Sequence, residues 1–114
     1  MVVERGSIWW AELGEPRGSG PGSRRPILVV QADAFNRSAI QTVIAVILSS
    51  NMRLLDAPGN VLIPARLAGL PKGSVANVSQ LITMDRGDLT EFAGRLDEAT
   101  LRRVDSGLRL VLHL

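Results

Sequence analysis

Two segments of this chain, Ile27–Gln31 and Thr42–Leu48, consist almost entirely of apolar, mostly branched residues. Runs of this length and composition are typical of buried β-strands. A pair of arginines, Arg24-Arg25, precedes the first run, and Ser49-Ser50-Asn51 ends the second. The sequence therefore predicts two buried strands that carry polar groups at one end of each.

These polar ends would meet if the two strands were antiparallel neighbours. The start of the first strand would then lie against the finish of the second, with Arg25 beside Ser49. A fixed guanidinium next to a hydroxyl, under the glycine-rich segment 18–23, suits a phosphodiester. A segment of this composition is equally typical of a plain surface loop.

The rest of the chain predicts further short strands. They are expected at Ser7–Leu13, Asn60–Pro64, Ser74–Val78 and Ser79–Thr83, the last two forming one long strand or two short ones with a kink between them. Within the first strand, Trp9 and Trp10 must face opposite sides of the sheet. A loop, with a helical turn as the alternative, is expected at 31–40. A second loop is expected at 52–58, and one helical turn at Leu89–Phe92.

The C-terminal segment predicts a helix. Asp97 is a suitable N-cap, and Leu101, Val104, Leu108 and Val111 recur at spacings of three and four, which makes one apolar face. Gly107 weakens the middle of such a helix by about 1 kcal/mol relative to alanine. Many short strands followed by one helix indicate a mainly β fold, a small and partly open antiparallel β-barrel with the helix packed on it. We expect a single domain over residues 1–114.

The charge of the chain says little about its partners. The net charge is +2, from 13 Lys+Arg against 11 Asp+Glu. The high pI of 10.4 follows because the chain has no Cys or Tyr to titrate above neutral pH. Arginine accounts for 12 of the 13 basic residues. This bias suits phosphate binding, and a high-GC genome would produce it equally well.

Several classes of catalytic site are excluded by composition. The chain has no cysteine and one histidine, His113, next to the end of the expected helix. This excludes Cys-ligated zinc and a two-histidine ribonuclease mechanism within one chain. Asp85 and Asp88 are interpreted as turn and cap residues rather than metal ligands. An arginine and a hydroxyl remain, and they can support RNA cleavage in which the substrate's own 2′-hydroxyl is the nucleophile.

The sequence also bears on location. No apolar run reaches the roughly 18 residues that a membrane helix needs. The N-terminal residues lack the charged and then apolar pattern of a signal peptide. A cytoplasmic protein that does not contact a membrane is therefore expected.

Several stretches, in order along the chain, resemble the MazF/PemK family of toxin endoribonucleases. They are Arg5–Leu13, Gly18-Ser19, Arg25–Gln31, Thr42–Ile47 with its serine end, Pro58–Val61, and Gly73–Asn77 with Gln80. The resemblance covers nearly the whole chain and is closest to the actinobacterial type. It implies a homodimer of partly open barrels that is blocked by a cognate antitoxin. It also implies sequence-specific cleavage of single-stranded RNA, usually mRNA, which inhibits translation and growth. Neither metal nor cofactor is implied, and the products would carry 2′,3′-cyclic phosphate and 5′-hydroxyl ends.

The resemblance also assigns site residues. The catalytic arginine of the family falls on Arg25, and its catalytic threonine falls on Ser49, or on Ser50 if the alignment slips by one. Serine keeps the hydroxyl but lacks the methyl that restricts the rotamer. Gly20 stands where many members have an acidic residue. An acid/base role for a carboxylate in this loop is therefore in doubt, and Arg25 would carry a larger share of catalysis. The implied RNA contacts, each equally readable as a turn, strand or loop residue, are Ser19, Arg24, Ser50, Asn51, Ser74, Gln80 and Arg86.

Two other functions remain open on the sequence. A related toxin family with a similar barrel poisons DNA gyrase by binding, and such a role would depend on the terminal helix rather than on Arg25. The second is a catalytically inactive module that binds RNA or an antitoxin. The serine at position 49 and Gly20 are compatible with this second function.

Overall fold

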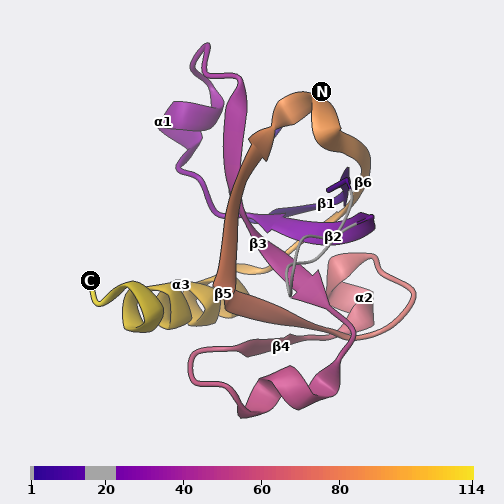
Figure 1. The fold of residues 1–114 in the computed structure, drawn as a ribbon, viewed down its shortest axis with the longest axis vertical. Coiled ribbons are helices and arrows are strands. Elements are labelled where there is room, and N and C mark those ends of the chain that lie inside the picture. The colour runs from indigo at the N-terminus through magenta and orange to yellow at the C-terminus, as the bar shows by residue number, and fades with distance from the viewer. Residues whose placement is uncertain (1, 15–22) are drawn as a thin grey trace.

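The computed structural model describes residues 2–14 and 23–114, which form a six-stranded antiparallel sheet with a C-terminal helix (Figure 1). The strands are β1 (Ser7–Glu12), β2 (Arg24–Val29), β3 (Thr42–Ser49), β4 (Val61–Ile63), β5 (Ser74–Asp85) and β6 (Leu89–Arg95). The helical segments are α1 (Asp33–Asn36), η1 (Met52–Asp56), α2 (Ala65–Ala68), η2 (Arg86–Asp88) and α3 (Glu98–Leu112). The mainly β fold with a terminal helix is therefore confirmed.

The sheet must curl, because its strand order is β4-β5-β3-β2-β1-β6. Only the three residues of η2 join β5 to β6, although three strands lie between them. In a flat sheet the two strands would be about 19 Å apart, whereas this connection spans at most about 14 Å. Figure 1 shows the upper end of β5 bending over to reach β6. The result is the partly open barrel that the sequence predicted.

Side chains on both faces of the sheet are buried. On the face that we call the helix face, Ile8, Leu28, Val46 and Leu48 pack with Val104 of α3. On the opposite face, which we call the barrel face, a second cluster includes Trp9, Ala11, Ile27, Val29, Val43, Ala45 and Ile47. Trp9 is buried in the barrel-face cluster and Trp10 packs against the helix-face cluster. The two tryptophans thus face opposite sides, as strand alternation requires.

Strand β5 is one long strand with a break in its register. Val46 of β3 pairs with Leu81, but the next residue, Ile47, pairs with Asn77. Residues 78–80 are therefore extra on the β5 side, and they bend the strand where the sequence predicted a kink. This bend directs the first half of β5 towards β4 and the second half towards η2 (Figure 1).

The helical turn predicted at Leu89–Phe92 is wrong, because this segment is the start of β6. Leu89 pairs with Ala11 and Phe92 pairs with Trp9. The pairing shifts register twice along β1, so β6 does not show the alternation by which a strand is recognised. The loops predicted at 31–40 and 52–58 contain the short helical segments α1 and η1.

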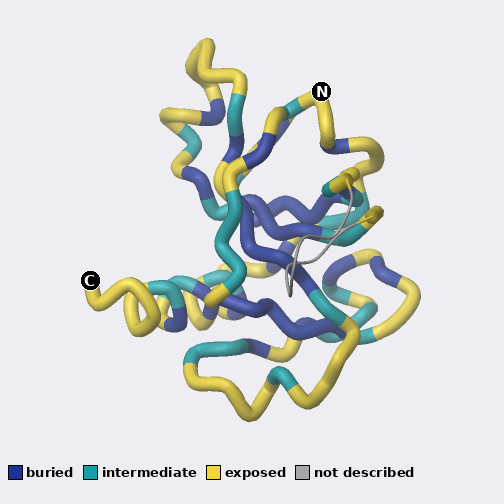
Figure 2. The backbone as a smooth tube through the Cα atoms, in the orientation of Figure 1, coloured by how far each residue is buried: buried dark blue, intermediate teal, exposed yellow. Residues whose placement is uncertain are grey.

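Helix α3 begins where the sequence predicted. The Asp97 carboxylate accepts a hydrogen bond from the Thr100 N–H and caps the helix. Val104 is fully buried, but Val111 is 43% exposed, because the last turn extends past the sheet (Figure 2). His113 caps the C-terminus in the left-handed conformation, with φ of 58°. No helix in the described part of the chain is long and apolar enough to span a bilayer.

Candidate nucleic-acid cleavage site

The pairing of β2 with β3 sets the candidate catalytic residues opposite each other. Ile27 pairs with Ile47 in antiparallel register. The same register, continued by two residues within both strands, places Arg25 opposite Ser49. Because side chains alternate along a strand, both residues share the barrel face with Ile27 and Ile47. These are the neighbours that antiparallel pairing of the two apolar runs predicts.

Both residues of this pair are partly exposed at the edge of the barrel-face cluster. Among residues 2–14 and 23–114, no carboxylate pairs with the Arg25 guanidinium and no hydrogen bond engages it. A guanidinium in this state can accept an anionic ligand without first losing a partner from this part of the chain.

The hydroxyl of Ser49 is oriented by the turn that follows it. Its Oγ accepts a hydrogen bond of 3.2 Å from the Asn51 N–H. Asn51 Oδ1 in turn accepts from the Arg53 N–H at 3.1 Å and caps η1. The serine proton therefore remains available for donation to a ligand. Ser50, the alternative match, is an exposed residue in the bend after the strand.

The adjacent arginine, Arg24, faces the other side of the sheet. Its guanidinium lies 4.5 Å from the centroid of the Trp10 ring and forms an ion pair of 2.7 Å with Glu91. Two consecutive arginines thus have different surroundings, and Arg25 alone of the two shares a face with Ser49. Arg24 is a matched comparison for Arg25 in any experiment.

Three side-chain amides meet beside this face, at the bend of β5. Asn77, which pairs with Ile47 and so lies on the barrel face, is only 7% exposed. Its Nδ2 donates to Gln80 Oε1 at 2.9 Å, and its Oδ1 accepts from Asn60 Nδ2 at 3.2 Å. Sequence reasoning selected Gln80 but missed Asn77 and Asn60. The available signal was an asparagine at a position of β5 that the surrounding apolar residues mark as buried.

The chain matches one family of known proteins over almost its whole length. The model of the PemK-like, MazF-like toxins of type II toxin-antitoxin systems matches residues 4–112. The chain belongs to this family. The resemblance that the sequence motifs indicated is confirmed.

Individual relatives agree with this assignment over all or nearly all of their length. The chain is 46% identical to endoribonuclease MazF6 of Mycobacterium tuberculosis over 114 residues, which is 100% of both chains. It is 33% identical to endoribonuclease EndoA of Bacillus subtilis, over 100% of this chain and 97% of that one. The MazE-MazF structure from Deinococcus radiodurans matches with a TM-score of 0.79 at 25% identity, covering 100% of this chain and 98% of that chain.

Not every residue that the family resemblance selected lies with the Arg25–Ser49 pair. Ser74 is 4% exposed. It is two residues from Ala76 on β5, so both side chains lie on the helix face, opposite to the face of Asn77. Arg86 donates through Nη2 to the Asn36 carbonyl at 2.6 Å, at the C-terminal end of α1. These positions give Ser74 and Arg86 packing and capping contacts in the described part of the chain. Ser19 and Gly20 lie outside the described residues.

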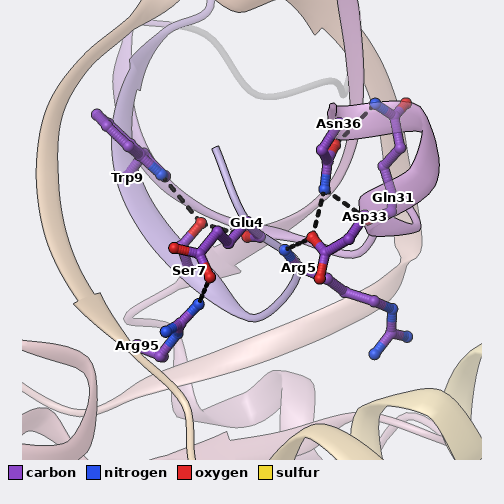
Figure 3. A network of polar contacts seen from close by, with 8 residues as sticks. All are labelled: Glu4, Arg5, Ser7, Trp9, Gln31, Asp33, Asn36 and Arg95. Atoms are coloured by element: carbon purple, nitrogen blue, oxygen red, sulfur yellow. Dashed lines mark hydrogen bonds and ion pairs between the residues drawn. The ribbon is translucent and has the colours of Figure 1, made fainter. Parts of the chain in front are cut away.

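A polar network anchors the N-terminal segment and α1 (Figure 3). The Asp33 carboxylate accepts from the Arg5 N–H at 2.8 Å and from Asn36 Nδ2 at 3.1 Å. The backbone hydrogen bond from Arg5, and then the one from Asn36, lower the pKa of Asp33 below its usual value. The Arg5 side chain bonds the Val30 carbonyl and forms an ion pair with Asp105 of α3. These contacts join the start of the chain to α1 and α3.

A cleft of about 470 Å³ opens near the end of β1, next to η2. Its lining includes the carboxylates of Glu12, Asp85 and Asp88. Negative charge disfavours phosphate here. Within the described residues, no three His, Cys, Asp or Glu side chains are grouped so that they could hold a metal ion.

Proposed function

We propose that this chain is the toxin of a type II toxin–antitoxin system and that it cleaves single-stranded RNA, usually mRNA, with Arg25 and Ser49 as catalytic residues. The position of Arg25 opposite Ser49 on one face, in a chain of this family, carries the proposal. Its relatives at 46% and 33% identity are named endoribonucleases. Cleavage of mRNA would inhibit translation and growth. Because the proposed substrate is mRNA, we expect the protein to act in the cytoplasm.

The proposed reaction takes its nucleophile from the substrate. The ribose 2′-oxygen attacks the adjacent phosphorus and loses its proton to solvent, the bond from phosphorus to the 5′-oxygen breaks, and that oxygen takes up a proton. The products carry 2′,3′-cyclic phosphate and 5′-hydroxyl ends, and DNA cannot react because it lacks the 2′-hydroxyl. Neither metal nor cofactor supplies a group to this scheme.

Each catalytic residue has a defined task in this scheme. The Arg25 guanidinium neutralises the charge that develops on the pentavalent phosphate, and two parallel N–H donors match two of its oxygens. The Ser49 hydroxyl donates to a non-bridging oxygen, because that oxygen can only accept, and the Asn51 N–H orients the hydroxyl oxygen without using its proton. Ser50 and Asn51, which follow directly, are exposed and extend this polar surface. Arg24 would contact RNA on the other face only if it left its partner Glu91.

The first experiment compares RNA with DNA in excess chelator. A long single-stranded RNA and its DNA copy are incubated with purified protein, and the fragment ends are analysed. We expect discrete RNA fragments with cyclic-phosphate ends and intact DNA. Arg25→Ala should lower the cleavage rate by at least about a hundredfold, a loss typical of removing a transition-state charge contact.

The control is the neighbouring arginine. Arg24→Ala should retain cleavage within a few-fold, because it removes an exposed ion pair and leaves the barrel face intact. Ser49→Ala and Ser50→Ala form a second matched pair, in which the first variant should lose activity. Cleavage by Arg25→Ala at the wild-type rate would contradict the mechanism. A folded wild-type protein that cleaves neither nucleic acid would contradict the function and favour gyrase binding or an inactive module.

The partners follow from the same family. The comparison structure from Deinococcus radiodurans is that of MazE with MazF. We infer that this chain likewise forms a homodimer and binds a cognate antitoxin that covers the RNA site. Light scattering of the purified protein should give twice the 12.3 kDa chain mass, and addition of the antitoxin should abolish cleavage.

A further inference from the structure

The side-chain amides of Asn60, Asn77 and Gln80 form a hydrogen-bonded chain at the bend of β5, and backbone groups fix the orientation of its first member. Asn60 donates through Nδ2 to the Leu54 carbonyl at 2.8 Å and accepts through Oδ1 from the Val78 N–H at 3.0 Å. A backbone carbonyl can only accept and a backbone N–H can only donate. These two contacts therefore determine which end of the Asn60 amide is oxygen and which is nitrogen.

This orientation passes to the next two amides. The Nδ2 of Asn60 also faces Asn77, so Asn77 must present its Oδ1 there, at 3.2 Å. The same oxygen accepts from the Ser79 hydroxyl at 3.1 Å. Asn77 Nδ2 is then left to face Gln80, which must present Oε1 to it, at 2.9 Å. The carbonyl end of the Gln80 amide is consequently turned inward.

The outward end of Gln80 is its NH₂ group. Gln80 is partly exposed, and its Nε2 has no protein partner within residues 2–14 and 23–114. The neighbouring Asn77 pairs with Ile47, two residues before Ser49 on β3, a separation of about 7 Å along the strand. A hydrogen-bond donor of fixed direction thus lies beside the proposed cleavage site.

We propose that Gln80, held by Asn60 and Asn77, is a specificity-determining residue that reads a carbonyl acceptor on one RNA base, uracil O4 or guanine O6. Cytosine and adenine present an amino donor at the corresponding position, which would face the Gln80 donor. Bases of single-stranded RNA expose these edges, so one residue can discriminate at one position of the recognition sequence. The proposal rests on the proposed ribonuclease activity and adds the chemistry of one base position to it.

The amide chain provides a specific way to reverse the preference. In Asn77→Asp both side-chain oxygens accept, so Asn60 and Ser79 keep their acceptor. Gln80 must then rotate its amide to donate inward, which turns its Oε1 outward. The residue that contacts RNA is unchanged, but its outward group becomes an acceptor that matches cytosine N4 or adenine N6.

The experiment cleaves a pool of RNA with randomised sequence and reads the cut sites by sequencing. For the wild type we expect one position at which uracil or guanine is preferred by about tenfold or more. Asn77→Asp should invert the preference at that position alone, and Gln80→Leu should abolish it there. Ser79→Ala is the matched control, because it removes one hydrogen bond to Asn77 without reorienting any amide, and it should keep the wild-type ranking.

The outcomes separate this inference from the function on which it rests. No cleavage by folded wild-type protein would overturn both. Cleavage by the wild type, together with an unchanged base ranking in Asn77→Asp or in Gln80→Leu, would overturn the role of Gln80 and leave the ribonuclease activity standing. Thermal unfolding of each variant confirms that the base ranking is measured on folded protein. A general loss of cleavage rate, without a change in base preference at one position, also counts against the inference.

Discussion

Gly107 lies in the middle of α3, where alanine is normally more favourable, yet the structure predicts that Gly107→Ala destabilises the protein. The helix approaches the turn at Gly59 so closely that an added Cβ would lie 2.1 Å from the Gly59 carbonyl oxygen and 3.0 Å from its carbon. Both atoms belong to the backbone, so no side-chain rotation can relieve the overlap. Gly59 directly precedes Asn60, the anchor of the amide chain.

The magnitude follows from two opposing terms. Replacing a helical glycine by alanine stabilises a helix by about 1 kcal/mol. Overpacking a close contact costs about 1–3 kcal/mol, and a backbone overlap of this depth belongs at the upper end. The net expectation is a loss of about 2 kcal/mol in the free energy of unfolding. For a domain of this size that corresponds to a fall in Tm of about 8 °C.

The assay is thermal unfolding followed by circular dichroism, at one fixed protein concentration because a dimer makes Tm depend on concentration. Two controls separate helix propensity from the contact. Ser106→Ala changes the exposed neighbour in α3 and should raise Tm slightly or leave it unchanged. At Gly87 a Cβ would meet nothing within 4 Å, so Gly87→Ala should stay within about 0.5 kcal/mol of the wild type. A Tm of Gly107→Ala equal to or above that of the wild type would refute the reasoning.

Two further predictions concern the site and the effect of pH. Ser49→Thr should retain cleavage within about threefold of the wild type, because the Asn51 N–H already orients the hydroxyl and the added methyl only restricts the same torsion; a steady-state rate at or below that of Ser49→Ala would contradict this. Asp33 has a folded-state pKa below its usual 3.8, so the stability that its ionised form contributes is present above that value and is lost as pH falls through the folded-state pKa. Denaturant titrations should therefore show Asp33→Asn less stable than the wild type at pH 7, with the gap narrowing as the pH falls below 3.8. A gap independent of pH would show that the carboxylate charge is not involved.

Much of the fold and part of the candidate site could be predicted from local sequence. The apolar runs 27–31 and 42–48 favour buried strands because their branched side chains pack well on the pleated surface of a sheet that is covered on both faces. Antiparallel pairing then sets Arg25 opposite Ser49, and strand alternation separates Arg25 from Arg24. The start of α3 was equally predictable, because the Asp97 side chain caps the helix by accepting a hydrogen bond from the backbone N–H only three residues further on.

Other features depend on atoms that are distant in the sequence. Nothing near Leu89 marks β6 as a strand, because its pairing with β1 shifts register twice. Gly107 reads as a weak point in a helix until the Gly59 turn is seen against it. Arg86, selected as an RNA contact, donates to a carbonyl of α1 some 50 residues earlier.

The sequence by itself determined where the long helix and every strand except β6 form and which side chains alternate, since these depend on the period of the backbone and on contacts within a few residues. Only the tertiary structure decided what each polar group does. The direction of the Gln80 amide depends on Asn60 and Asn77, which the pairing of β4 with β5 brings together. A hydrogen-bonding group acquires its donor or acceptor role from its partner in space, and for these residues the partner is set by the fold.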